Sequence, residues 1–430
     1  MEKRLGQKCL LGLQHVLAMF GATVLVPMLT GLNPSIALVS AGIGTLLFHM
    51  ITKKKVPVFL GSSFAFIAAI QFVLQTDQLD NVTNQMITLD NLAKVKGALI
   101  VAGLIYILFA LIIKFVGYEK VTRILPPIVT GPMIIVIGLR LSGTAVNSAL
   151  YNNGEFAPKY ALVAFLVVLT IILISVFTKG FINLMPILVA LIVGYVLCVP
   201  FGILNVKEWW SSVRGASVIS FTDDWIIDQL TVLPKFDINA ILAIAPIAIV
   251  TIIEHVGDIT TNGAVVGKNF IADPGVHRTL CGDGLATLFA GFLGGPANTT
   301  YGENTGVLAV TKNYDPSIIR IAAGFAIFLG IFGNVGAIIQ NVPAPVSGGI
   351  SIVLFGMIAS VGVRILINNK VDMSNSRNLM IASLIFVLGI GITNINITST
   401  VTISGLAIAA LFGIVFSLVL PEKAGTKQAE

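Results

Sequence analysis

Charged residues are scarce in this sequence: Asp, Glu, Lys and Arg make up 11% of its 430 residues. A water-soluble protein carries about 25% charged residues, so a soluble enzyme and a charged, disordered chain are excluded. The three cysteines, Cys9, Cys198 and Cys281, are scattered and have no metal-ligand spacing, which excludes a disulfide scaffold. The chain also lacks the alternation of apolar and polar residues that a membrane β-barrel requires. A helical membrane protein is the class that remains.

Apolar residues account for 56% of the chain. Windows of about 20 residues with few or no charges, each able to cross a hydrocarbon core of ~30 Å, allow about fourteen spans. We expect them to begin near residues 9, 35, 56, 95, 124, 160, 181, 238, 279, 296, 318, 346, 379 and 400. The sequence therefore predicts an all-α polytopic membrane protein surrounded by lipid.

The 26 basic residues lie in short clusters between the apolar runs rather than along one face. This pattern indicates membrane topology, and no nucleic-acid partner is expected. If the N-terminus is cytoplasmic, most of the basic residues fall in cytoplasmic connections, as the positive-inside rule requires. We therefore expect a multi-pass protein of the cytoplasmic (inner) membrane with both termini in the cytoplasm.

An internal repeat is visible at two places. Residues 127–138 align without gaps on residues 345–356, and the match includes a proline and two glycines. A second pair, Gly61–Phe64 and Thr299–Gly302, lies in the expected third and tenth spans. Seven spans per unit would bring the second unit into the membrane from the opposite face, giving two inverted repeats of seven. We also expect the fifth and twelfth spans, which carry Gly131 and Gly349, to form matching close-packed surfaces against which the substrate-carrying half moves.

Two carboxylates, Glu254 and Glu303, occur within apolar spans. A carboxylate at the bilayer centre costs about 2.5 to 3.5 kcal/mol on insertion scales, so it is rarely there without a partner or a cavity. The stretches 61–66 and 296–306 combine glycine, proline and threonine at membrane depth, where broken backbone is tolerated only beside a cavity. The expected third and tenth spans should therefore contain short broken or extended segments.

Such breaks expose helix N-termini, whose free N–H groups donate hydrogen bonds to carbonyl oxygens. Phe64 and Tyr301 occupy matching places in the two repeats and would put an aromatic ring on each side of one cavity. Carboxylates accept hydrogen bonds from ring N–H groups. These groups together describe a site for a small heterocycle with alternating N–H and C=O groups.

The same residues carry a family resemblance. The stretch 303–312, Glu-Asn-Thr-Gly-Val-Leu-Ala-Val-Thr-Lys, resembles the signature of the nucleobase/ascorbate transporter family, with Asn304, Gly306 and Thr311 at its supporting positions. Leu13-Gln14-His15 with residues 20–27 resembles the family's first span, residues 61–66 its third and residues 254–257 its eighth. The likeness covers nearly the whole chain and is strongest to the bacterial uracil permeases.

The resemblance implies a homodimeric secondary active transporter that takes up uracil with protons by alternating access. It also implies a core domain of spans 1 to 4 and 8 to 11 and a gate domain of spans 5 to 7 and 12 to 14. In this chain, the core domain would comprise residues 1–116 and 237–340, and the gate domain would comprise residues 117–236 and 341–430. No cofactor or metal is expected beyond the proton as coupling ion.

The resemblance also assigns site residues. Glu254 and Glu303 would bind the ring nitrogens, and the backbone of Phe64 and Gly302 would meet the ring carbonyls. Two further residues, Ala22 and Tyr301, would line the pocket. The glutamate at position 303 is similar to the uracil branch, because the purine branches usually carry glutamine there.

One position departs from the family pattern. Uracil permeases of this kind have a second histidine four residues after the eighth-span glutamate, in a position linked to proton coupling, and this chain has Asp258 there. A carboxylate can also carry a proton, which leaves the pH range and the coupled ion open. Glu254 and His15 are the other candidates for proton coupling, because His255 is expected to point about 100° away from the adjacent Glu254 around its helix.

Three alternatives remain open at the level of sequence. An aspartyl intramembrane protease would need paired aspartates, and Asp258 and Asp283 are the candidates, both expected near cytoplasmic span ends. An anion transporter of related inverted-repeat architecture would favour a basic or neutral site. A xanthine or guanine permease of the same family is the nearest alternative.

Overall fold

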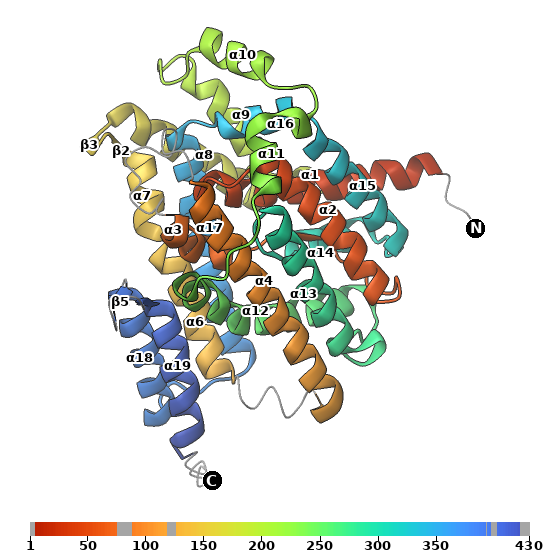
Figure 1. The fold of residues 1–430 in the computed structure, drawn as a ribbon, viewed down its shortest axis with the longest axis vertical. Helices are drawn as coiled ribbons and strands as arrows, with labels where there is room; N and C mark the ends of the chain where they lie inside the picture. Colours follow the sequence, from red (N-terminus) through yellow and green to blue (C-terminus); the bar gives the residue numbers. More distant parts are fainter. Residues whose placement is uncertain (1–4, 75–87, 118–125, 393, 397–401, 422–430) are drawn as a thin grey trace.

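A computed structural model describes residues 5–74, 88–117, 126–392, 394–396 and 402–421 (Figure 1). Within these residues, seven helices are long and apolar enough to cross a membrane. They are α1 (Leu5–Thr30), α2 (Pro34–Ile51), α4 (Leu89–Val116), α6 (Pro127–Arg140) continued by α7 (Ser142–Leu150), α8 (Pro158–Phe177), α12 (Ile238–Val266) and α17 (Ala344–Asn368). The chain is a multi-pass, all-α membrane protein.

Shorter helices complete the bundle. The apolar ones are η1 (Phe64–Phe66) with α3 (Ile67–Leu74), α9 (Pro186–Cys198), α15 (Pro316–Ile331), α18 (Ser376–Gly391) and α19 (Gly405–Val419). The helices α13 (Val276–Leu293) and α14 (Gly302–Thr311) are more polar. Short helices between them include α10 (Val206–Gly215), η2 (Ile182–Leu184), η3 (Ser220–Thr222), α11 (Asp224–Thr231), η4 (Ile271–Gly275) and α16 (Gly333–Gln340). Many of the apolar helices begin at a proline, whose missing N–H costs nothing in a first turn.

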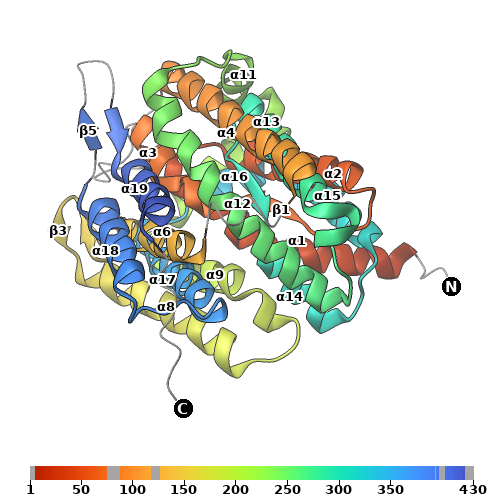
Figure 2. The same cartoon turned by 90° about the horizontal axis from the view of Figure 1, so that it is seen from below.

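The helices pack in two sets that lie side by side (Figure 2). In the first set, α13 packs on α4 and α2, α15 packs on α2 and α1, and α12 packs on α4 and α14. In the second set, α17 packs on α6, α7 and α8, while α18 and α19 pack on each other and on α6. The long polar connection from α9 to α12 carries α10 at one end of the molecule, at the top of Figure 1, and α11, which contacts α4.

Glycines bring the helices of the first set into close contact. A Cβ added at Gly103 of α4 would lie 2.7 Å from the carbonyl oxygen of Gly284 on α13. A Cβ at Gly42 of α2 would lie 2.6 Å from the carbonyl oxygen of Ala323 on α15. Small residues at such crossings let backbones approach closely, which drives helix association in lipid.

The repeated proline-glycine motif falls in α6 and α17, which pack on each other. Gly131 of α6 faces Leu366 and Gly362 of α17, and Gly349 of α17 faces Ala164 and Val167 of α8. The two glycines themselves pack within their own set, while α6 also contacts α12 and η1, and α17 contacts α1 of the first set. The sequence pattern alone does not say which neighbour a helix face meets.

This packing predicts different effects for two glycines on the same helix. A Cβ at Gly349 would lie 2.8 Å from the backbone oxygen of Ala164, whereas a Cβ at Gly356 would have nothing within 4 Å. We expect Gly349→Ala to lower the free energy of unfolding by about 1 to 3 kcal/mol through overpacking, and Gly356→Ala to leave it nearly unchanged. Thermal unfolding of the purified protein in detergent measures both. Equal stability of the two variants would contradict the packing described here.

Two extended segments pair at the centre of the first set. The strands β1 (Leu60–Ser62) and β4 (Asn298–Thr300) are antiparallel, with Gly61 opposite Thr299. Two further short pairs, β2 (Tyr151–Asn152) with β3 (Glu155–Phe156) and β5 (Asn394–Asn396) with β6 (Thr402–Ser404), lie in the second set. The extended segments expected around residues 61–66 and 296–306 are therefore present.

Threonine hydroxyls from neighbouring helices form hydrogen bonds with backbone groups on the two outer edges of the central two-stranded ribbon. The backbone N–H of Leu60 donates to Thr45 Oγ1 of α2 over 2.9 Å. On the other edge, Thr287 Oγ1 of α13 donates to the carbonyl of Asn298 over 2.8 Å. Unpaired backbone groups are costly in a membrane, so these contacts allow a sheet fragment to exist inside a helical bundle.

Candidate functional site

The central ribbon points two helix N-termini toward one region. After β1 the chain enters η1 at Phe64, and after β4 it enters α14 at Gly302. Because the strands are antiparallel, the two helices leave the ribbon in opposite directions. The N-terminus of each helix therefore lies at one of the two ends of the ribbon. The first N–H groups of a helix have no partner within the helix, so both ends can donate to a ligand. Gly302 is exposed although Tyr301 before it is buried.

Three carboxylates lie beside these helix ends. Glu254 and Asp258 are one turn apart on α12 and share a face, and Glu303 is in the first turn of α14. All three are half-buried. The hydroxyl of Thr300 donates to Asp258 Oδ2 over 3.2 Å, and a Cβ at Gly302 would lie 3.9 Å from Asp258 Oδ1.

These carboxyl groups are close enough to interact electrostatically. Glu254 interacts with Glu303 and with Asp283, and Asp258 interacts with all three. Like charges gathered at low dielectric repel one another. The N–H groups of a ligand can pair with these acceptors.

The aromatic residues join the same site. Tyr301 is 3% exposed, and its hydroxyl donates to the carbonyl of Ser62 over 2.8 Å. A Cβ on Gly61 would lie 2.4 Å from two ring carbons of Tyr301, so the ring rests directly on the ribbon. Ala22 of α1 is buried in one apolar cluster with Tyr301, and Phe64 packs against that cluster. The structure thus brings together Ala22, Phe64, Tyr301 and Gly302 from three parts of the chain.

His15 lies on the buried side of α14. Its Nδ1 accepts a hydrogen bond from Asn304 Nδ2 over 3.1 Å, and the same amide donates to the backbone carbonyl of His15. His15 is 1% exposed. The structure therefore joins this predicted proton-coupling candidate to a signature residue next to Glu303.

The other signature residues lie further along α14. Gly306 faces Leu184 of η2, with 3.5 Å between an added Cβ and the leucine Cδ2. Thr311 donates to the carbonyl of Val307 within its own helix over 2.8 Å. These contacts shape α14 and its surroundings, and they do not bring Gly306 or Thr311 to the carboxylates.

A buried histidine-aspartate pair behind the carboxylates was missed by the sequence reasoning. His255 Nδ1 lies 2.8 Å from Asp283 Oδ2, and His255 Nε2 lies 2.9 Å from Thr279 Oγ1. Both His255 and Asp283 are 0% exposed. Asp283 lies two turns inside α13, so the expectation that it sits near a span end is wrong. An aspartate in an apolar run was the signal that could have indicated a buried partner.

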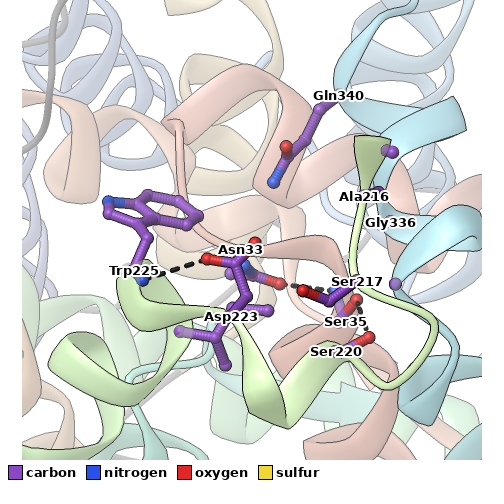
Figure 3. Close-up of a pocket in the computed structure, with 12 residues that line it drawn as sticks. Asn33, Ser35, Ala216, Ser217, Ser220, Asp223, Trp225, Gly336 and Gln340 are labelled. Carbon is purple, nitrogen blue, oxygen red and sulfur yellow. Dashed lines mark hydrogen bonds between the residues drawn. The ribbon is translucent and has the colours of Figure 1, made fainter. Parts of the chain in front are cut away.

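The structure also has a polar pocket of about 60 Å³ at the N-terminus of α2 (Figure 3). Asn33 accepts hydrogen bonds from the first turn of α2, and Ser220 donates to Gly330 over 2.9 Å and to Ser35 over 3.1 Å. None of the three carboxylates lines this pocket. Several of its polar groups are already paired, so the carboxylate cluster is the better candidate for a transport site.

A bundle of apolar helices interrupted at its centre by a ribbon, two helix N-termini and three carboxylates defines a polytopic membrane transporter. Solved transporters share the fold. The transmembrane domain of the cyanobacterium bicarbonate transporter BicA matches with a TM-score of 0.63 and 16% identity, over 97% of this chain and 98% of that one. Murine Slc26a9, an anion transporter, matches with a TM-score of 0.66 and 10% identity, over 98% and 69%. At these identities the likeness shows the fold alone.

The model of the Permease family matches residues 6–398. The uracil permease of Bacillus caldolyticus is 43% identical over 97% of this chain and 92% of its own length. Those of Bacillus subtilis (strain 168) and Escherichia coli (strain K12) are 42% and 37% identical over 95% of this chain, and 92% and 90% of theirs. The chain therefore belongs to this permease family, the nucleobase/ascorbate transporters. It is a transporter and not an enzyme, which removes the intramembrane protease alternative.

Proposed function

We propose that this protein is a secondary active transporter that takes up uracil with protons. The proposal depends on one observation: Glu254 and Glu303 lie beside the N-termini of η1 and α14. Uracil has two N–H donors and two C=O acceptors, and this region offers carboxylate acceptors and backbone donors. The names of the relatives that share 37 to 43% identity, uracil permeases, support the same substrate.

The proposed contacts follow from this chemistry. Glu254 and Glu303 accept from the ring N–H groups, and the backbone N–H groups of Phe64 and Gly302 donate to the ring carbonyls. Ala22 and Tyr301 form the apolar wall of the pocket, which agrees with their common cluster.

The proposed architecture is fourteen spans in two inverted repeats of seven. Residues 1–116 and 237–340 form a core domain that carries the substrate, and residues 117–236 and 341–430 form a gate domain. The antiparallel pairing of β1 with β4 and the division of helix contacts into two sets support this arrangement. Alternating access then moves the core relative to the gate.

The proton is the proposed coupling ion, without a further cofactor or metal. Asp258 is the proposed carrier, with Glu254 and His15 as the other candidates. The hydrogen bond from Thr300 links Asp258 to the strand that precedes Gly302. A proton on Asp258 would therefore change the electrostatic potential at the backbone N–H of Gly302, which is the proposed contact to a ring carbonyl.

We further propose a homodimer in the cytoplasmic membrane with both termini in the cytoplasm.

Two other substrates are less well supported. A purine such as xanthine is the nearest alternative within the family, and the glutamate at position 303 favours uracil over it. An inorganic anion, as in the structural neighbours, would meet several carboxylates at the site, which disfavours a negative charge.

Competition binding to the purified protein tests the substrate. We expect unlabelled uracil to displace labelled uracil, xanthine to do so weakly and sulfate not at all. Displacement by xanthine at lower concentrations than uracil would assign the protein to the purine permeases. Failure to bind any nucleobase would contradict the proposal.

The contact between Gly61 and Tyr301 makes a further prediction. A methyl group at residue 61 would overlap the tyrosine ring and lie 2.7 Å from Thr23 Oγ1. Because the ring is held by its hydrogen bond to Ser62, we expect Gly61→Ala to weaken uracil binding by roughly five- to 150-fold, from about 1 to 3 kcal/mol of overpacking at the site. Gly324→Ala, where an added Cβ has nothing within 4 Å, is the control. Unchanged binding in Gly61→Ala would place the substrate away from the ribbon.

A further inference from the structure

Asn262 is a fully buried polar residue of α12 that makes none of the proposed substrate contacts. It follows Glu254 and Asp258 at intervals of four residues, so the three side chains share one face of the helix. Its Nδ2 donates to the carbonyl of Pro57 over 3.2 Å and to Thr305 Oγ1 over 3.0 Å. One amide group thus joins α12 to two other segments of the site.

Both of these segments lead to proposed substrate contacts. Pro57 lies just before β1, which ends before Phe64, and Thr305 lies two residues after Glu303. Asp258 is beside Gly302, and one turn further along both helices Asn262 is beside Thr305. The two helices therefore run side by side in the same direction. The Asn262–Thr305 hydrogen bond fixes the rotation and the height of α14 against α12.

We propose that Asn262 is a positioning residue for substrate binding. By holding Thr305 and Pro57, it sets where Glu303 and the backbone of Phe64 lie relative to Glu254. This inference rests on the proposed function, because it assumes that Glu254 and Glu303 bind one ligand together. Asn262 acts through these groups and does not touch the substrate.

Uracil binding to the purified full-length chain tests the proposal. We expect Asn262→Ala to weaken binding about tenfold, the loss that two buried hydrogen bonds imply. In a Glu303→Gln background the same substitution should cost less than in the parent, because one of the two groups that Asn262 positions has already lost its charge. Asn269→Ala, in the exposed loop after α12, should bind uracil like the parent.

Substitutions at Thr305 separate positioning from folding. Thr305→Val removes the hydroxyl with little change of shape and should weaken binding severalfold, whereas Thr305→Ser keeps the hydroxyl and should restore it. The double variant Asn262→Ala/Thr305→Val should be no weaker than Asn262→Ala alone.

Three results would overturn the inference. The first is parent-like binding in Asn262→Ala, and the second is equal binding by Thr305→Val and Thr305→Ser. The third is a loss of uracil affinity in the double variant Asn262→Ala/Glu303→Gln that equals the product of the losses in the two single variants. Should Asn262→Ala fail to fold, the two Thr305 variants decide alone. A parent protein that binds no uracil would instead contradict the proposed function.

Discussion

Glu303→Gln is expected to weaken uracil binding by about ten- to a hundredfold. The substitution replaces a charged acceptor with a neutral amide, and hydrogen bonds to charged groups contribute about 1.5 to 3 kcal/mol. The amide also brings an N–H₂ donor toward a ring N–H donor. Calorimetric titration of the purified variant with uracil measures the change.

Glu208→Gln is the matched control for this experiment. Glu208 is an exposed residue of α10 that bonds to Asn205, so its loss should leave uracil binding unchanged. If Glu303→Gln bound uracil as tightly as the parent, Glu303 would have no part in the site.

Asp258→Asn is expected to keep uracil exchange and lose proton-driven accumulation. One proton moved inward with neutral uracil transfers one charge, which at ~100 mV is worth about 2.3 kcal/mol, or roughly fiftyfold accumulation. An asparagine can still accept from Thr300 but cannot release a proton. We expect Asp258→His to restore accumulation with a different pH profile, because imidazole titrates near neutral pH.

Labelled uracil in proteoliposomes separates exchange from accumulation for these variants. Asp228→Asn, at an exposed carboxylate of α11, should transport like the parent. If Asp258→Asn still concentrated uracil under an inward proton gradient, the coupling group would lie elsewhere, and Glu254 would be tested next.

Much of the helical framework could be predicted from the sequence because its signals are local. The expected span near residue 238 begins at Ile238, and the spans expected near residues 35 and 318 begin at Pro34 and Pro316. The breaks near Gly61 and Pro296 were also indicated, because glycine and proline at membrane depth are compatible with few backbone conformations.

The candidate site was only partly predictable. Glu254 and Glu303 were conspicuous because charge is so rare in the chain, and Phe64 and Tyr301 were matched through the repeat. The partners of these residues were not predictable. The pairing of His255 with Asp283, and of Asn262 with Thr305, depends on how separate helices are rotated against each other. The neighbours of Gly131 and Gly349 could not be predicted for the same reason.

Uptake of labelled uracil into proteoliposomes containing the purified protein tests the central claim most directly. The account predicts saturable uptake that rises above the external concentration when an inward proton gradient is imposed. Unlabelled uracil should abolish this uptake, and sulfate should not affect it. Uptake that ignores the proton gradient, or that sulfate blocks and uracil does not, would contradict the account.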